Sequence, residues 1–146
     1  MRWLPVVAAA AALAANTNTA AAAQPNPCTL LTEPDVAGLL GANVASHTRW
    51  HAGVRATGCR WIARNRASLT LIVAQRTRAQ YERSAHDTPR SIRVGGLGDP
   101  AFAVPPAEGA FLVVWRDGYA LELSTAGVMS RLALEKRAAR TALKRV

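Results

Sequence analysis

The sequence lacks the short motifs that mark the common enzyme and nucleotide-binding classes. Only two of the 146 residues are cysteine and three are histidine, and the cysteines do not form the Cys-x-x-Cys pair of a thiol-redox site. No Gly-x-Ser-x-Gly elbow is present for a hydrolase nucleophile, and no Gly-Lys-Ser/Thr follows a glycine-rich loop. We therefore expect a protein that is not an enzyme and holds no cofactor, with a hydrolase site assembled only by the fold as the alternative.

Acidic residues are scarce. Nine Asp and Glu stand against 18 Lys and Arg, which gives a net charge of +9, and all but two of the positive residues are arginine. A positive field favours anionic partners, such as an anionic component of the cell envelope or an acidic protein. Because the chain carries no recognised nucleic-acid motif, we do not expect nucleic acid to be a partner.

The only long apolar run lies at the N-terminus. Met1 and Arg2 give a positive start, residues 3–15 are apolar, and residues 20–23 are four alanines. This pattern predicts a cleavable signal peptide over residues 1–23. About a dozen apolar residues are fewer than the ~20 that span a bilayer, so we expect no transmembrane segment after cleavage.

The two cysteines also bear on location. An exported chain passes into an oxidising compartment, so Cys28 and Cys59 are expected to form a disulfide. Cys28 follows Pro-Asn-Pro rather than the small-residue box of a lipoprotein. We therefore expect a secreted or extracytoplasmic protein without a lipid anchor. The proline-rich residues 24–27 predict an extended linker, followed by a single domain over residues 28–146.

Three helices are predicted from capping and periodicity. Thr32 can cap a helix that Gly41 ends. Thr77 and Gln80 have the spacing of a capping box, which predicts a helix ending near His86. A third helix is predicted from about residue 129 to residue 145.

Alternating runs predict two β-hairpins. Residues 59–63 and 69–73 flank one turn, and residues 111–115 and 119–124 flank Asp117-Gly118, a strong hairpin signal. Two further predictions concern the segments between these hairpins: residues 91–104 add one or two strands, whereas residues 42–56 show no clean period and are expected to be a loop, with at most a short strand near Val44.

These elements predict an α+β fold in which helices pack on one face of a mainly antiparallel sheet of four to six strands. A hairpin followed by a helix occurs twice, over residues 57–86 and 110–145. This order suggests a hairpin-helix pseudo-repeat.

Residues 27–32, 58–61 and 96–102 carry a resemblance. Their sequences, Pro-Cys-Thr-Leu-Leu-Thr, Gly-Cys-Arg-Trp and Gly-Leu-Gly-Asp-Pro-Ala-Phe, are similar to those of a group of small exported actinobacterial proteins, many of them lipoproteins, that carry a domain of unknown function. The resemblance implies an α+β envelope domain with paired cysteines, and it implies no catalytic residues. The chain differs from the lipoproteins of that group because it lacks their lipid-acceptor cysteine.

Two groups of residues resemble catalytic or metal sites only in part. His47 and His51 would share a zinc ion if they lay on a helix, but Thr48 stands where a metalloprotease has glutamate. We interpret both as exposed loop histidines beside Trp50 and expect no metal site. A second group, at residues 84–87, contains serine, histidine and aspartate within one helical turn, too close together for the geometry of a hydrolase triad.

The C-terminal helix is the strongest candidate for a binding surface. Its apolar stripe is expected to lie in the core, and it consists of Val128, Leu132, Ala139, Leu143 and Val146. The other face carries Arg137, Arg140 and Lys144, which either contact an anionic partner or form ordinary solvated surface.

Each tryptophan could likewise lie in the core or on a binding surface. Trp61 and Trp115, on alternating strands, are expected in the core, whereas Trp50 is a second candidate for partner binding. We thus expect an exported cell-envelope domain that binds a ligand or partner without catalysis. The alternatives are a small secreted hydrolase and an inhibitor or effector of another protein.

Overall fold

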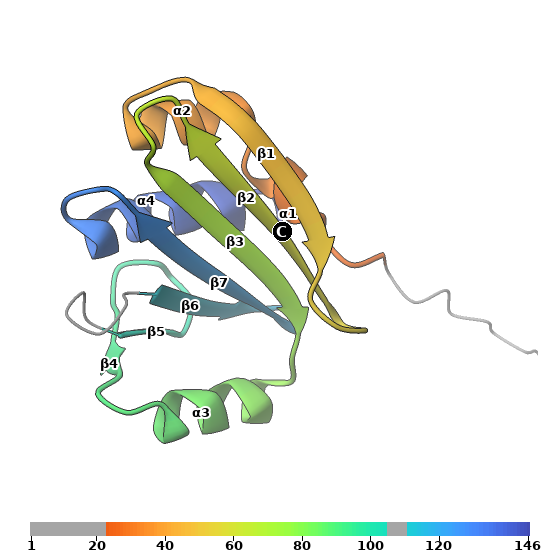
Figure 1. The fold of residues 1–146 in the computed structure, drawn as a ribbon. Coiled ribbons are helices and arrows are strands. Elements are labelled where there is room, and N and C mark those ends of the chain that lie inside the picture. Colours follow the sequence, from red (N-terminus) through yellow and green to blue (C-terminus); the bar gives the residue numbers. More distant parts are fainter. Residues whose placement is uncertain (1–22, 105–110) are drawn as a thin grey trace, which may run out of the picture.

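The structure is a computed structural model that describes residues 23–104 and 111–146. The predicted signal peptide lies outside the described residues, apart from Ala23. The described part of the chain is α+β, with a seven-stranded antiparallel sheet and four helices (Figure 1). The strand order is β1-β2-β3-β7-β6-β5-β4. The strands are β1 Val44–His51, β2 Ala56–Ala63, β3 Ser68–Gln75, β4 Ile92–Arg93, β5 Ala101–Val104, β6 Phe111–Arg116 and β7 Tyr119–Ala126.

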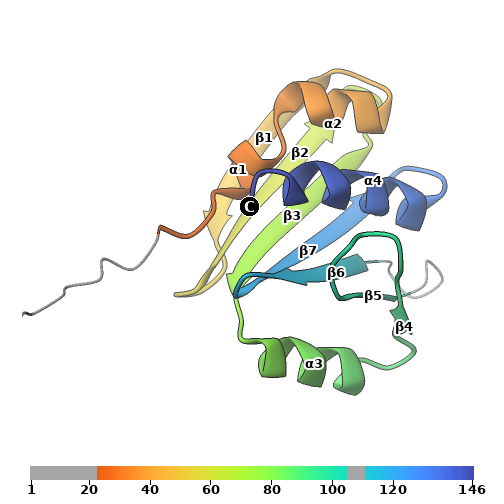
Figure 2. The same cartoon turned by 180° about the vertical axis from the view of Figure 1, so that it is seen from behind.

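Helices lie on both faces of the sheet, so the prediction of one covered face was wrong. Seen from behind, α1, α2 and α4 lie across the sheet, while α3 lies apart from them (Figure 2). Tyr81 of α3 packs with Phe102 and Val113, whose neighbours along the strands, Ala103 and Leu112, belong to the main core. Because successive side chains of a strand point to opposite faces, α3 covers the face opposite to α4. The helices are α1 Pro27–Leu30, α2 Glu33–Leu40, α3 Arg78–Asp87 and α4 Arg131–Leu143.

Strand β1 raises the strand count above the four to six expected and replaces the loop predicted for residues 42–56. It is an edge strand that pairs only with β2. Six of its eight residues are exposed, with Val44 and Trp50 half-buried. A strand with so little burial on either side has no hydrophobic alternation, which explains why the sequence pattern did not reveal it.

Local signals placed α2, α3 and the β6-β7 turn correctly, whereas α1 was not predicted. Thr32 and Thr77 each form a capping box at the start of α2 and α3, and Gly41 ends α2 in the left-handed conformation. At the β6-β7 turn, Asp117 and Gly118 have φ angles of 49° and 86°. A two-residue hairpin turn of type I′ needs positive φ at both positions, and Asp-Gly supplies it at low cost.

The residues predicted as a linker are docked on the domain. The Gln24 side chain donates to the Val73 carbonyl at 2.6 Å. The Asn26 side chain accepts from the Cys28 amide and caps α1, whose first residue, Pro27, is buried. The segment before Cys28 therefore belongs to the folded unit.

The disulfide joins Cys28 of α1 to Cys59 of β2, with the Cα atoms 5.4 Å apart. Cys59 and Trp61 lie on the same face of β2 in the main core, and Trp61 is 1% exposed. The bond therefore fastens a helix to the sheet beside Trp61, as the sequence predicted.

Helix α4 packs through a wider buried face than the stripe predicted. Of that stripe, Ala139 and Leu143 are buried in the main core, and Val128, Leu132 and Val146 are half-buried against it. The buried residues that the prediction missed are Leu134, Glu135, Ala138 and Ala142. The order hairpin then helix does occur twice, but α3 and α4 cover opposite faces, so the two copies do not superpose as units.

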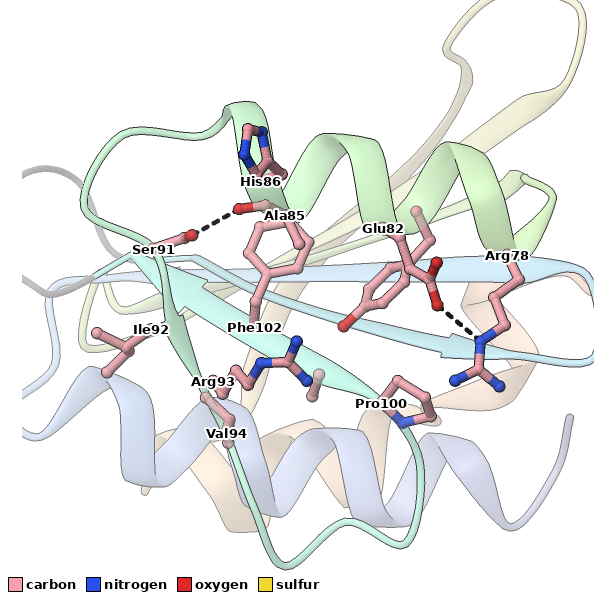
Figure 3. Close-up of a pocket in the computed structure, with 12 residues that line it drawn as sticks. Arg78, Glu82, Ala85, His86, Ser91, Ile92, Arg93, Val94, Pro100 and Phe102 are labelled. Atoms are coloured by element: carbon pink, nitrogen blue, oxygen red, sulfur yellow. Dashed lines mark hydrogen bonds and ion pairs between the residues drawn. The ribbon is translucent and has the colours of Figure 1, made fainter.

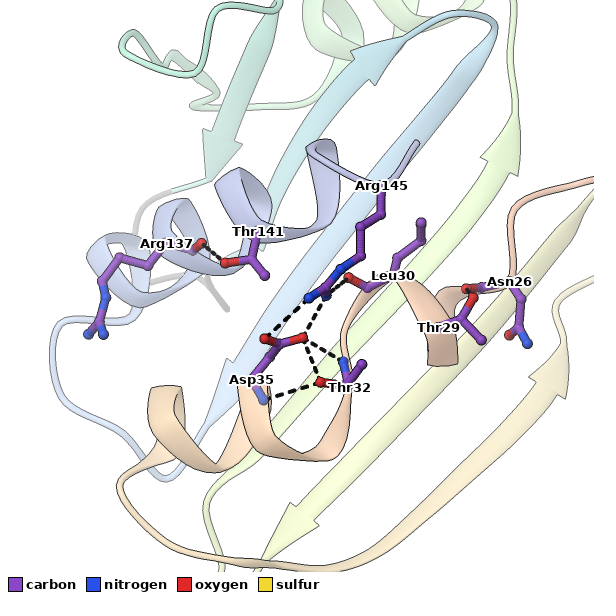
Figure 4. Close-up of polar contacts among 8 residues, drawn as sticks. All are labelled: Asn26, Thr29, Leu30, Thr32, Asp35, Arg137, Thr141 and Arg145. Carbon is purple, nitrogen blue, oxygen red and sulfur yellow. Dashed lines mark hydrogen bonds and ion pairs between the residues drawn. The ribbon is translucent and has the colours of Figure 1, made fainter.

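The last turn of the chain is tied to α1 and α2 by one arginine (Figure 4). Arg145 Nη1 donates to the Leu30 carbonyl at 2.8 Å and to Asp35 Oδ2 at 2.6 Å. Because Asp35 also caps the start of α2 through Thr32, this arginine links three helices. No helix in the described ranges is long and apolar enough to cross a membrane.

Candidate functional site

A cavity with a volume of about 680 Å³ lies between α3 and the β4-β5 hairpin (Figure 3). We call it the α3 cavity. Its lining includes Arg78, Tyr81, Ala85, Arg93 and Phe102. The volume lies in the range of small-molecule sites, about 300–1,000 Å³.

Two aromatic rings contribute to the apolar part of the α3 cavity, together with smaller apolar residues such as Ala85 and Pro100. Tyr81 comes from α3 and Phe102 from β5; the ring centroids are 5.5 Å apart and the planes are tilted by 47°. Both side chains are less than one-tenth exposed. Phe111 of β6 meets Phe102 edge-on at 6.4 Å. Packed rings with fixed orientation provide a rigid surface for an apolar ligand group.

Arginines supply the charge of the α3 cavity. Arg78 pairs with Glu82 at 2.9 Å, and its guanidinium lies 5.8 Å from the centre of the Trp115 ring. Arg93 has no carboxylate within ion-pair distance among the described residues. In Figure 3 its side chain extends beneath α3. The cavity therefore combines an aromatic surface with an arginine that has no acidic partner in the part of the chain that the structure describes.

Burial raises the pKa of the Tyr81 hydroxyl above its ordinary value, and the positive charge of Arg93 acts in the opposite direction. Tyr81 is consequently a neutral phenol at physiological pH. A neutral hydroxyl can donate a hydrogen bond to an anionic ligand group.

The α3 cavity also contains residue types that a hydrolase would use. His86 and Ser91 both line it, but the His86 ring contacts Asp87 at 3.0 Å and the Ser91 hydroxyl donates to the Ala85 carbonyl at 2.7 Å. In Figure 3 the imidazole lies at the end of α3, apart from Arg93. A nucleophile must lie within hydrogen-bond reach of its base, and this pair has no such bond.

A smaller cavity of about 220 Å³ lies on the other side of the Tyr81–Phe102 pair, and both residues line it as well. Ser84 and Glu122 contribute polar groups to it. Neighbouring side chains partly shield the Glu122 carboxylate from water, which raises its pKa. Because Ser84 lines this cavity and His86 the other, the fold does not bring the sequence-adjacent Ser84, His86 and Asp87 together into one site.

The two histidines considered as metal ligands lie on β1, not in a loop. His47 Nδ1 is 2.8 Å from Glu33 Oε1. The sequence did not predict this contact, because the two residues are far apart along the chain. Residues four apart along a strand are separated by about 13 Å, so His47 and His51 cannot share one metal ion. Within residues 23–104 and 111–146 no group of three His, Cys, Asp or Glu could hold a metal.

The four residues predicted to bind a partner do not form one surface. Arg137, Arg140 and Lys144 lie on α4. Trp50 lies on β1 with its ring over Gly58, on the face opposite to α4 because Gly58 alternates with the core residue Cys59.

Trp115 is only half-buried rather than in the core. Its ring nitrogen donates to the Arg76 carbonyl at 3.0 Å, so it joins the sheet to the segment before α3.

Sequence reasoning did not identify Tyr81, Arg93 or Phe102 as site residues. They come from three elements that meet only in the folded chain. One signal was present: Tyr81 is the only large apolar side chain in α3, so it had to mark the packed face of that helix.

Comparisons with protein-family models, with curated proteins and with solved structures found no match. The resemblance of residues 27–32, 58–61 and 96–102 to exported actinobacterial proteins therefore stays a prediction.

Proposed function

We propose that this chain is an exported cell-envelope domain that binds a small ligand in the α3 cavity and does not transform it. One observation carries the proposal: a cavity of about 680 Å³ joins the Tyr81–Phe102 ring pair to Arg93, which has no acidic partner among the described residues. Arg93 is exposed, so its guanidinium is accessible to an anionic ligand group and can form charge-assisted hydrogen bonds with it.

The expected ligand has an apolar or aromatic body and one anionic group. Its apolar part would cover the rings of Tyr81 and Phe102, while the anionic group would accept hydrogen bonds from Arg93. A planar guanidinium binds a carboxylate, sulfonate or phosphate through two parallel hydrogen bonds.

Export is proposed from the signal-peptide pattern and is supported by the Cys28–Cys59 bond, because disulfides persist in oxidising compartments. We propose a secreted or extracytoplasmic location without a lipid anchor. The resemblance to small exported actinobacterial proteins supports export, and the lack of their lipid-acceptor cysteine supports the absence of an anchor.

Fluorescence of anilinonaphthalene sulfonate tests the proposal, because this probe has apolar rings and one anionic group. We expect saturable binding of one probe molecule to the folded protein. Arg93→Gln should weaken probe binding about tenfold, because the variant loses a charge-assisted hydrogen bond to the sulfonate. Ala85→Trp should fill the cavity and abolish binding, whereas Ala79→Trp, on the exposed side of the same helix, should bind as the wild type does.

Equal probe binding by the wild type and the Ala85→Trp variant would overturn the α3 cavity as the site. A hydrolase remains the alternative because His86 and Ser91 line the same cavity. Ester or phosphodiester turnover that is lost in both His86→Ala and Ser91→Ala would replace the binding proposal with that one. A stable complex with an envelope protein that Ala85→Trp leaves intact would favour an inhibitor or effector.

A further inference from the structure

We propose that α4 and the glycine turn at residues 95–98 form a second site, which binds the phosphoryl group of an anionic ligand. This site is built from Gly96, Lys136, Arg140 and Lys144 and is called the α4 site. It lies outside the α3 cavity and does not depend on the function proposed for it.

Two cations converge on Gly96. A Cβ atom added at this glycine would lie 3.7 Å from Arg140 Nη2 and 4.0 Å from Lys136 Nζ. The φ angle of Gly96 is +81°, which glycine adopts without strain. Arg140 Nε also donates to the Gly96 carbonyl at 3.4 Å, which orients its guanidinium over the turn.

No acid neutralises these cations. Within the described residues, neither Lys136, Arg140 nor Lys144 has a carboxylate within ion-pair distance. Two other arginines nearby, in contrast, do have carboxylate partners. Arg116 binds both oxygens of Asp99, at 3.2 and 2.6 Å, and Arg145 binds Asp35. Asp99 and Asp35 thus pair with arginines that hold elements together, while Lys136, Arg140 and Lys144 have no carboxylate partner in the described ranges.

Two surface cavities lie next to Arg140. One of about 460 Å³ is lined by Gly96, Gly98, Arg140 and Lys144. Another, of about 430 Å³ between α2 and α4, is lined by Arg137 and Arg140. Arg140 lines both, so its guanidinium can contact a ligand from either side. A phosphoryl group fits in the first cavity with its oxygens toward the cations, whereas the second is also lined by Asp35, whose negative charge disfavours an anion there.

The chemistry of the three side chains matches a multivalent oxyanion. Arginine supplies a planar pair of donors, and lysine supplies a compact charge. Like charges held close together repel, and a bound anion converts this repulsion into attraction. A phosphoryl group has enough oxygens for all three side chains, whereas a carboxylate has only two.

Pyrophosphate and inorganic phosphate are the probes for the first experiment, with binding followed by calorimetry. We expect Lys136→Gln combined with Arg140→Gln to weaken pyrophosphate binding at least about tenfold. The matched control is Arg64→Gln combined with Arg83→Gln, which removes the same charge from two exposed positions elsewhere and should bind as the wild type does. If both variants lose the same affinity for pyrophosphate, the loss is due to net charge alone and the proposed site is wrong.

A pair of glycine variants tests the geometry. Gly98 also has a positive φ, +77°, but no atom lies within 4 Å of an added Cβ. Gly96→Ala and Gly98→Ala should therefore cost similar backbone strain, while only Gly96→Ala should weaken pyrophosphate binding. If both variants bind pyrophosphate as tightly as the wild type, Gly96 is not part of the site.

Vesicles distinguish the source of the phosphoryl group. Phosphatidylcholine vesicles with added phosphatidylglycerol, bound by the wild type and not by the Lys136→Gln/Arg140→Gln variant, would assign a lipid headgroup. Binding of free phosphate or pyrophosphate without vesicle binding would assign a soluble ligand. Binding to neither, or binding that the variant leaves unchanged, overturns the proposal. In every case anilinonaphthalene sulfonate should bind the variant normally, which keeps this test separate from that of the α3 cavity.

Discussion

Glu135 of α4 accepts two hydrogen bonds from Thr125 of β7. The backbone N–H of Thr125 lies 3.1 Å and its hydroxyl 3.0 Å from the same oxygen, Oε1. Glu135 is fully buried, and its other oxygen has no partner among the described residues. Burial raises the pKa of Glu135 to about 7, although the two bonds from Thr125 act to lower it. The core between helix and sheet therefore contains an acid that titrates near neutral pH.

This acid should make the protein less stable as the pH rises toward neutrality. Below pH 4.5 Glu135 is protonated in both the folded and the unfolded chain. Between pH 4.5 and about 7 the unfolded chain loses the proton while the folded chain keeps it, so the free energy of unfolding falls, by on the order of 3 kcal/mol. Urea unfolding at a series of pH values measures this slope.

Glu135→Gln should remove the slope, because the amide does not titrate. The variant should equal or exceed the wild type in stability above neutrality and lose that advantage near pH 4.5. Glu82→Gln, at an exposed carboxylate, is the control and should keep the wild-type slope. A slope that survives Glu135→Gln would show that another group causes it.

The burial of Glu135 was missed because the apolar stripe of α4 was assigned from its larger side chains. Half of the buried residues of α4 are alanines, and Glu135 precedes Ala138 and Ala139 by three and four residues. Residues at these spacings share a helix face. Small side chains allow α4 to lie close to the sheet. Because alanine is only weakly hydrophobic, the sequence pattern did not identify these positions as the buried face.

Removing the disulfide should destabilise the fold without changing its topology. Cys28 and Cys59 are 31 residues apart, and in the chain-entropy model opening such a loop costs about 4 kcal/mol. The free energy of unfolding of a Cys28→Ser/Cys59→Ser variant should be lower by this amount, so the variant should unfold at a lower urea concentration. Mass analysis of exported wild-type protein should find no free thiol; two free thiols would contradict a structural role for the bond.

The sequence predicted elements that local chemistry determines. The capping boxes at Thr32 and Thr77 and the Asp117-Gly118 turn each depend on hydrogen bonds or φ angles within a few residues, so they can be read without the fold. The face of the sheet that a helix covers depends on distant residues. Helix α3 packs against Phe102, which lies more than a dozen residues beyond its end, and the α3 cavity arises only from that packing.

The Asp35–Arg145 pair should contribute stability that is lost in acid. The side-chain hydrogen bond from Arg145 is the main cause that lowers the pKa of Asp35 from 3.8 to about 2. The contribution is complete above pH 3.8 and disappears as the pH falls toward 2, because the folded chain must then accept a proton at a paired carboxylate. Arg145→Gln should lower the unfolding midpoint at neutral pH and flatten the acid side of the stability profile.

Arg140→Gln is the control for that variant, since it removes an arginine from α4 that has no acidic partner among the described residues. Its unfolding midpoint should stay close to that of the wild type. Equal effects of Arg140→Gln and Arg145→Gln would indicate that net charge, and not the link to Asp35, stabilises the end of the chain.

Gly58 provides the space in which the Trp50 ring lies. A Cβ atom at Gly58 would come within 2.3 Å of Trp50 Cζ2, so Gly58→Ala must displace the ring from the sheet. Because the ring lies on an edge strand and can move into solvent, we expect a loss of about 1 kcal/mol, the low end for overpacking. Trp50→Ala should remove the clash, so adding Gly58→Ala to that variant should cost less than adding it to the wild type. Gly38→Ala is the control, since no atom lies within 4 Å of its added Cβ and alanine favours the helix. Urea unfolding together with acrylamide quenching of tryptophan fluorescence measures both effects, and unchanged quenching in Gly58→Ala would show that Trp50 does not cover Gly58.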